Sequence, residues 1–303
     1  MHALRKPRAL RPGATLGIAA PAFAVDPACL DAGVEGLRAA GFRVRVGEGV
    51  RAQQGYLAGD DERRARDLLA LIDDPSVDAV LCARGGYGCQ RILPRLDAAL
   101  VRRAAKPLVG YSDVTALHLW QLRQAGLTGF HGPMLEHGAW SEPEADAVRA
   151  ALEGRAGEVV LTGEARGGGR AEGRLVGGSL KLVATSLGTP FEVDTDGAVL
   201  LLEDVAEKPY AIDRMLRQLE AAGKLARLAG VGVGYLTGCV DPKRAEPTAE
   251  AVIEEVLGPL GVPRVFGLPF GHDRPNLPWP VGVRGAIDGE RGELRVLESG
   301  VEG

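Results

Sequence analysis

The chain has 303 residues, which is more than one domain usually needs, so we expect two domains. A hydrophobic content of 46% suits a globular protein with a large core, and a net charge of -4 argues against nucleic acid as the main partner. No apolar run approaches the roughly 20 residues of a membrane span, so we expect no membrane partner.

The N-terminal basic residues precede an apolar stretch that mimics a signal peptide. Gly17 and Pro21 interrupt this stretch, so it is better interpreted as a first buried strand at 15–20. None of the four cysteines belongs to a C-x-x-C pair. Without a secretion signal, scattered cysteines of this kind predict reduced thiols and a cytoplasmic location.

Strand and helix signals alternate through the first half of the chain. We expect strands at 15–20, 42–46, 79–82, 107–109 and 128–130. We expect helices at 27–40, at 60–73, from residue 89 onward, at 114–125 and at 142–152. Repeated β-α-β units form a parallel sheet with helices on both faces, so the predicted fold class is α/β.

The pattern changes after residue 152. Residues 154–174 contain seven glycines and few large apolar residues. We therefore predict a linker at 151–174, between a first domain at 1–150 and a second at 175–303. Further strands are expected at 198–202, 231–236, 265–268, 281–287 and 293–296, with helices at 209–222 and 248–257. The second domain is thus expected to be smaller and rich in strands.

The strongest functional signal is the segment 106–119, which reads K-P-L-V-G-Y-S-D-V-T-A-L-H-L. A short apolar strand ends in a tight turn with Ser112 at its apex, and a helix follows at once. Such a turn lifts a hydroxyl clear of the sheet, as in a nucleophile elbow, and nearby helix amides stabilise negative charge. Ser-Asp before a helix is also an ordinary N-cap, and the pattern is G-x-S-x-T rather than G-x-S-x-G.

A serine nucleophile needs a base, and the base needs an orienting carboxylate. Of the five histidines, His131 and His272 are the two that end strands. Glu203 is the first polar residue after the buried run A-V-L-L-L, although Glu203 or Asp204 could equally begin a solvated loop. The loop A-R-G-G-Y-G at 83–88 permits close backbone approach and could present an amide to an oxyanion.

Several signatures of other chemistries are missing from the sequence. The glycine loop is not G-x-G-x-x-G, no G-K-[ST] follows it, and there is no H-E-x-x-H or paired-cysteine pattern. We therefore expect neither a cofactor nor a metal.

Six motifs follow one another along the chain: R-G-G-Y-G, G-Y-S-D-V-T-A-L, F-H-G-P-M, G-G-S-L, L-L-E-D and F-G-H-D. With them the chain resembles the LD-carboxypeptidases, the muramoyl-tetrapeptide carboxypeptidases of the serine peptidase class. The resemblance extends from the opening P-G-A-T-L-G-I-A-A-P-A to the final strands. It implies an α/β N-terminal domain that bears the nucleophile and a C-terminal domain that supplies the other two members of a triad.

The resemblance assigns Ser112 as nucleophile, Glu203 as orienting carboxylate and His272 as base. It implies an oxyanion hole from the backbone amides of Asp113 and of the Gly85-Gly86 loop, in which we prefer Gly86.

The resemblance also gives His131 a structural or binding role. One position departs from the family, because Ser179 in G-G-S-L replaces the asparagine of G-G-N-L. This departure puts a binding role for Ser179 in doubt.

The implied reaction is hydrolysis of the bond between the L-centre of a diamino acid and a terminal D-Ala. This reaction turns a muropeptide tetrapeptide into a tripeptide during cytoplasmic cell-wall recycling, and the resemblance implies a homodimer. Arg84 and Arg274 neighbour the expected oxyanion and base loops, and either could hold a substrate carboxylate bidentately. Each could equally form an ordinary salt bridge.

Two other functions fit the sequence. The microcin C self-immunity peptidases resemble the same family and cleave aminoacyl-nucleotide analogues, and Trp140 could stack on such a base. That group tends to be longer than this chain, which favours the muropeptide. The third interpretation is a non-enzymatic two-domain binding protein, in which serine, glutamate and histidine need not converge.

Overall fold

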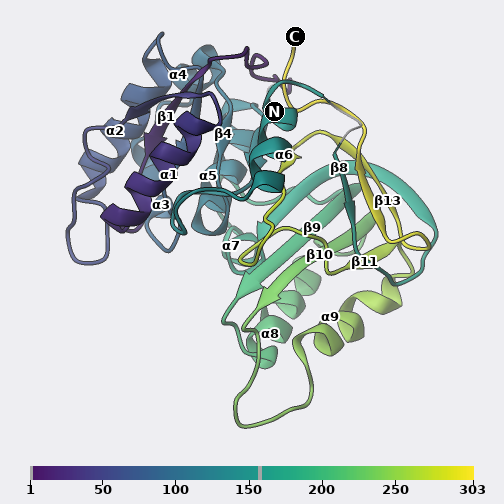
Figure 1. Ribbon diagram of the computed structural model, residues 1–303. Coiled ribbons are helices and arrows are strands. Elements are labelled where there is room, and N and C mark those ends of the chain that lie inside the picture. Colours follow the sequence, from purple (N-terminus) through teal and green to yellow (C-terminus); the bar gives the residue numbers. More distant parts are fainter. Residues whose placement is uncertain (1–2, 156–158) are drawn as a thin grey trace.

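A computed structural model describes residues 3–155 and 159–303 of the chain (Figure 1). Two sheets organise it, each flanked by helices. The α/β fold class predicted from the sequence is confirmed. Within the described residues there is no helix long and apolar enough to cross a membrane.

The first sheet has six strands in the order β12-β5-β4-β3-β1-β2. Its strands are β1 (Thr15–Ala19), β2 (Arg43–Val46), β3 (Ala79–Cys82), β4 (Leu108–Val109), β5 (Gly129–His131) and β12 (Trp279–Val281). The first five are parallel, whereas β12 runs antiparallel to β5. A segment from the C-terminal part of the chain therefore completes the sheet that carries the predicted nucleophile.

Helices surround this sheet, and the longer ones begin at polar caps. The helices are α1 (Pro27–Ala39), α2 (Asp61–Asp73), α3 (Cys89–Ile92), α4 (Ala98–Ala104), α5 (Thr115–Trp120) and α6 (Glu142–Leu152), with the short turns η1 (Leu93–Arg95), η2 (Ser112–Val114) and η3 (Gln121–Ala125). Asp26 and Asp60 cap α1 and α2 by accepting from their first-turn amides.

The second sheet has eight strands in the order β6-β14-β13-β8-β9-β10-β11-β7. They are β6 (Val160–Thr162), β7 (Glu164–Ala165), β8 (Arg170–Ser179), β9 (Ala198–Val205), β10 (Gly230–Thr237), β11 (Arg264–Phe266), β13 (Arg284–Asp288) and β14 (Glu293–Val296). The helices here are α7 (Leu180–Thr185), α8 (Pro209–Ala221) and α9 (Ala249–Leu257), followed by η4 (Gly258–Leu260). Strands β8 to β11 are parallel, and the others pair antiparallel.

Two cores sandwich the second sheet. The three helices cover one face of β9 and β10 with an apolar cluster that includes Leu216 and Ile253. The other face packs on a cluster around Phe270 and Trp279. Because β9 lies between parallel neighbours, residues 198–204 are all buried, which explains its continuous apolar run.

Two details of the sequence prediction were wrong. The predicted linker at 151–174 contains β6, β7 and the first half of β8, which belong to the second sheet, while residues 156–158 lie outside the described residues. The single strand predicted at 281–287 is divided between β12 and β13 by Gly282, whose φ is +98°. Its two parts belong to different sheets.

Candidate active site

Ser112 stands at the turn between β4 and the helix that follows. Its φ is +59°, in the left-handed region that costs a residue with a side chain about 1–2 kcal/mol. Gly110 precedes it because any Cβ there would lie 2.9 Å from Val114. The tight turn and its strained apex are the geometry predicted for a nucleophile elbow.

The N-cap interpretation of Ser-Asp is wrong for this helix. No side chain caps η2. The carboxylate of Asp113 instead accepts the Cys89 amide at 2.7 Å, at the start of α3. The backbone amide of Asp113 lies in the first turn of η2, where amides have no intrahelical partner.

The glycine loop after β3 lies directly against Ser112. A Cβ on Gly85 would be 2.8 Å from the Ser112 Cβ, 3.0 Å from its Oγ and 3.3 Å from the Asp113 nitrogen. Gly86 has a φ of +101° and packs against Phe23, since a Cβ there would meet the ring at 2.4 Å. Both glycines are therefore required by close approach, and the loop and the Asp113 amide surround the same hydroxyl.

His272 joins Ser112 to Glu203. Its Nε2 lies 3.0 Å from the Ser112 Oγ, and its Nδ1 lies 2.6 Å from the Glu203 Oε2. Because a carboxylate only accepts, Nδ1 carries the proton and Nε2 is free to accept from the serine hydroxyl. Gly271 allows this approach, since a Cβ there would lie 2.9 Å from the same Glu203 oxygen. The structure thus brings together all three residues predicted as a triad.

The surroundings of His272 set its charge. Burial lowers the pKa of the imidazole, but the negative charge of Glu203 and the hydrogen bond to it outweigh burial and raise the pKa above 6.5. Glu203 is fully buried at the carboxyl end of β9. This arrangement favours a protonated imidazole, the form that arises when a base takes the serine proton.

Asp204, the alternative orienting carboxylate, faces the other way. Its Oδ2 accepts the Lys181 amide at 2.8 Å. Burial, together with the charge of Glu203, raises the pKa of Asp204 to about 6. Alternation along the strand separates the two carboxylates, so only Glu203 contacts His272.

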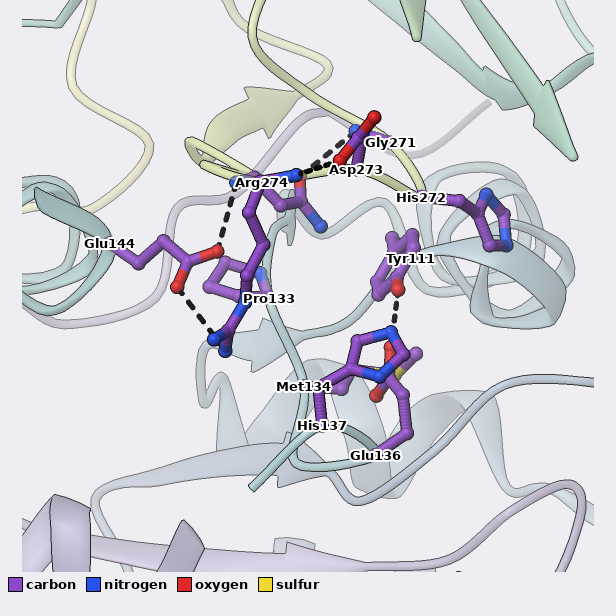
Figure 2. A pocket seen from close by; sticks show the side chains of 11 residues that line it. Tyr111, Pro133, Met134, Glu136, His137, Glu144, Gly271, His272, Asp273 and Arg274 are labelled. Carbon is purple, nitrogen blue, oxygen red and sulfur yellow. Dashed lines mark hydrogen bonds and ion pairs between the residues drawn. The ribbon is translucent and has the colours of Figure 1, made fainter. Parts of the chain in front are cut away.

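A cavity of about 260 Å³ adjoins His272 (Figure 2). It is lined by Tyr111, Pro133, Met134, Glu136, His137, Glu144, Gly271, His272, Asp273, Arg274 and Asn276. The Tyr111 ring meets the His272 ring edge-on at 4.8 Å, and its hydroxyl donates to Glu136.

Asn276 links the cavity wall to the base. Its side-chain Oδ1 accepts the Gly271 backbone amide at 3.1 Å, and its backbone amide donates to the buried Glu144 carboxylate at 3.0 Å. Asn276 is 3% exposed, and its Nδ2 has no hydrogen-bond partner among the described residues. Tyr111, Glu136 and Asn276 were not predicted from the sequence, although Tyr111 lies in the motif G-Y-S-D and the other two follow F-H-G-P-M and F-G-H-D within three residues.

The two arginines predicted to bind substrate have different surroundings. Arg274 lines the cavity, donates to the Ala139 carbonyl at 2.9 Å and lies 3.5 Å from Glu144. Arg84 is not among the lining residues. Its guanidinium lies 5.6 Å from the Phe23 ring centre and donates to the Ala24 carbonyl at 2.9 Å.

The remaining sequence candidates lie beside the site. His131 is 1% exposed and stacks on Trp279 at 5.0 Å, and burial holds the pKa of this histidine well below 6.5. Ser179 donates its amide to Thr115 at 3.1 Å and thereby joins β8 to the helix after Ser112. Among the residues the structure describes, no three His, Cys, Asp or Glu side chains gather as a metal site would require.

Comparison with known proteins gives two family matches. The LD-carboxypeptidase N-terminal domain matches residues 16–132, and the LD-carboxypeptidase C-terminal domain matches residues 172–287. A probable murein peptide carboxypeptidase of Bacillus subtilis is 40% identical, over 98% of this chain and 95% of its own.

Two solved structures are similar throughout. Muramoyltetrapeptide carboxypeptidase from Oxalobacter formigenes has a TM-score of 0.83 at 28% identity, covering 93% of this chain and 97% of its own. MccF in complex with glutamyl sulfamoyl guanosine has a TM-score of 0.91 at 22% identity, covering 98% and 99%. The second likeness concerns the fold alone.

Proposed function

Since the chain belongs to the LD-carboxypeptidase family, we propose that it is a serine carboxypeptidase that removes the terminal D-Ala from muropeptide tetrapeptides. The observation that carries the proposal is the hydrogen-bonded series from Ser112 through His272 to Glu203. A non-enzymatic binding protein would not need this convergence.

In the proposed mechanism, the Ser112 Oγ attacks the carbonyl carbon of the bond to D-Ala while His272 Nε2 takes its proton. The amides of Asp113 and Gly86 donate to the oxygen that becomes negative. His272 then gives the proton to the D-Ala nitrogen as the C–N bond breaks, and Glu203 stabilises the imidazolium between the two transfers. Water, activated by the same histidine, hydrolyses the ester.

The cavity beside His272 suits the leaving residue. A carboxypeptidase must recognise a free carboxylate, and burying that charge without partners is costly. Asn276, whose Nδ2 has no hydrogen-bond partner among the described residues, and Arg274 both line this cavity, so they support carboxylate binding there. We assign Arg84 the lesser part, because it does not line this cavity.

Amidation of the terminal D-Ala tests this assignment. It should lower kcat/KM sharply in the wild type, and Arg274→Met should cause a comparable loss on the free acid with little further loss on the amide. Arg84→Met is the matched control. If the Arg84 change reproduces this pattern and the Arg274 change does not, the carboxylate lies at the glycine loop instead.

A second candidate is cleavage of an aminoacyl-nucleotide analogue, which rests on the fold shared with MccF. Trp140 gives it little support, because its indole donates to the Met134 carbonyl at 2.9 Å and its ring packs on the core of the first domain. Assaying a tetrapeptide and an aminoacyl sulfamoyl nucleoside with the same enzyme separates the two functions: we expect turnover of the tetrapeptide alone.

We also propose the homodimer and the cytoplasmic role in cell-wall recycling that the family resemblance implies. Sedimentation velocity tests the first, and fractionation of cells that produce the protein tests the second.

A further inference from the structure

Exposed aromatic rings gather beside the glycine loop, and the mechanism does not use them. Tyr56 and Tyr87 are 54% and 43% exposed. The rings of Phe23 and Tyr56 lie 5.1 Å apart, and those of Tyr56 and Tyr87 lie 6.1 Å apart. Large rings exposed together on a surface point to a binding function.

Backbone hydrogen bonds join the segments that carry these rings to the glycine loop beside the nucleophile. The Phe23 amide donates to the Gly85 carbonyl at 3.2 Å, and the Ala24 amide donates to the Tyr56 carbonyl at 2.9 Å. Gly85 is the residue packed against Ser112. Tyr87 follows it by two positions, so their Cα atoms are at most about 7.6 Å apart. The aromatic cluster therefore lies close to the nucleophile, at which the scissile bond is cleaved.

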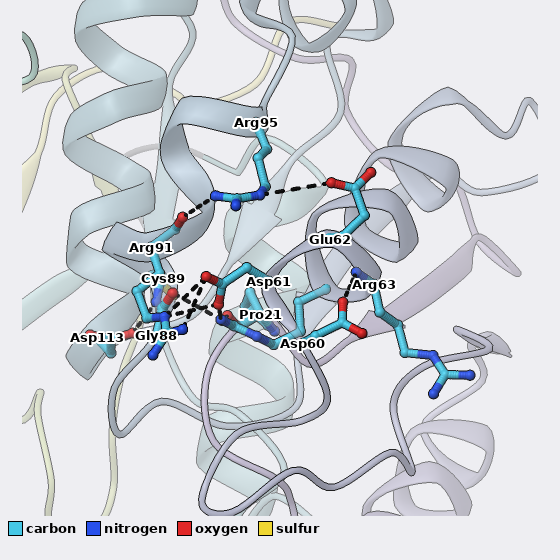
Figure 3. A network of polar contacts seen from close by, with 11 residues as sticks. Pro21, Asp60, Asp61, Glu62, Arg63, Gly88, Cys89, Arg91, Arg95 and Asp113 are labelled. Carbon is cyan, nitrogen blue, oxygen red and sulfur yellow. Dashed lines mark hydrogen bonds and ion pairs between the residues drawn. The ribbon is translucent and has the colours of Figure 1, made fainter.

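A groove of about 530 Å³ opens at Tyr56. We call it the Tyr56 groove; it is lined by Gln54, Gly55, Tyr56, Leu57, Asp60, Asp61, Glu62, Arg91 and Arg95. Figure 3 shows how its charged residues are held: Arg91 binds Asp61 at 2.9 Å, and Arg95 lies 3.8 Å from Glu62. Arg64 donates to the Gly88 carbonyl at 2.9 Å and so fixes the glycine loop to the same network.

The composition of the groove selects the chemistry of its occupant. Three carboxylates face two guanidinium groups, and these guanidinium groups are already engaged, so a phosphate would be repelled. Carboxylate, guanidinium and amide groups beside an aromatic face instead suit an uncharged sugar. Its hydroxyl and acetamido groups form hydrogen bonds, and its C–H face packs on the ring.

We propose that the Tyr56 groove binds the N-acetylated amino sugar attached to the stem peptide while the bond to D-Ala lies at Ser112. The inference rests on the proposed function. Three residues separate the sugar from that bond and span about 11 Å or more when extended. An extended stem peptide at Ser112 is therefore long enough to pass the Tyr87 backbone, whose Cα lies at most about 7.6 Å from that of Gly85.

The test compares kcat/KM for a free tetrapeptide and for the N-acetylmuramoyl tetrapeptide. The wild type should prefer the sugar-linked substrate, and Tyr56→Ala should lower this preference by about two- to tenfold. Tyr210→Ala is the control, since Tyr210 is 57% exposed but lies on α8; it should leave the preference unchanged. If Tyr56→Ala leaves the ratio of the two kcat/KM values unchanged, the inference is overturned. An equal loss on both substrates, as general disruption of the fold would cause, is one form of this result.

A binding measurement separates this inference from the proposed function. The uncharged disaccharide N,N′-diacetylchitobiose should broaden NMR signals of Tyr56 and Tyr87, and adenosine monophosphate should not. If neither tetrapeptide is cleaved but the disaccharide binds there, the proposed function fails and the sugar site stands. Preferential binding of the nucleotide, or a dimer that Tyr56→Ala dissociates without changing the substrate ratio, would assign the groove to another occupant.

Discussion

Replacing Glu203 by glutamine keeps the shape of the side chain and removes its charge. A hydrogen bond to a charged group contributes about 1.5–3 kcal/mol, which corresponds to a loss of about 10- to 150-fold. We expect more, about 10⁴ in kcat, because the glutamine amide can donate to His272 Nδ1 and so stabilise the tautomer whose Nε2 cannot accept the serine proton. The contact concerned is the one of 2.6 Å between Nδ1 and Oε2.

The pH dependence gives this variant a second signature. In the wild type, Glu203 raises the pKa of His272 above 6.5 against the effect of burial. Without that charge, burial dominates and the pKa falls. The residual activity should therefore reach its plateau at lower pH than wild-type activity does, because the neutral imidazole is the base.

Steady-state kinetics between about pH 5 and pH 9 test both effects, with Asp204→Asn as the matched control. Asp204 contacts the Lys181 amide instead of the base, so its variant should keep kcat within about tenfold. A crippled Asp204→Asn beside an active Glu203→Gln would refute the assignment of the orienting carboxylate. Thermal unfolding of each variant checks that the fold is retained.

The other predictions are shorter. Wild-type kcat/KM should rise with pH through a pKa above 6.5, as His272 loses its proton; a profile that falls over this range would contradict a histidine base. Gly85→Ala should lower kcat by at least about 100-fold, because its Cβ would lie 2.8 Å from Ser112, whereas Gly49→Ala, with neighbours no closer than 3.4 Å, should be nearly neutral in the same assay. Ser112→Gly should be inactive, yet its free energy of unfolding should exceed that of Ser112→Ala by about 1 kcal/mol, because glycine adopts a positive φ without strain. Equal melting temperatures of the two variants would mean that the turn is unstrained. Activity should persist after exhaustive chelation of metal ions. If chelation abolishes activity and added zinc restores it, the enzyme uses another mechanism.

The sequence was informative where function imposes local rules. The G-Y-S-D turn predicted the elbow, because a hydroxyl at a strand-to-helix turn needs a small residue before it. Glu203 was a candidate because it is the first polar group after a buried strand, and the family resemblance assigned its role. Asp113 was ambiguous, since a carboxylate after a serine reads as an N-cap, and only the fold directs it to Cys89.

Glycine explains the main error in the domain plan. The glycines of 154–174 suggested a flexible linker, but several of them permit close packing of backbones. A Cβ on Gly173 would lie 2.5 Å from the Gly197 carbonyl, and one on Gly163 would lie 2.2 Å from that of Phe266. Composition alone does not distinguish a glycine that loosens the chain from one that lets two strands approach.

The cavity beside His272 could not be predicted for a different reason. Tyr111, Glu136 and Asn276 come from separate loops, and their proximity follows from the pairing of β12 with β5. Local patterns contain no information about that antiparallel pairing, which joins the C-terminal part of the chain to the first sheet.

Mass spectrometry of a muropeptide mixture tests the central claim most directly. The mixture is incubated with the wild type or with Ser112→Ala, and all products are identified. We predict that the wild type removes a single alanine from tetrapeptides, leaves tripeptides unchanged, and that Ser112→Ala removes none. Cleavage inside the stem peptide, or loss of alanine with the Ser112→Ala protein, would contradict a serine carboxypeptidase that acts on the terminal D-Ala.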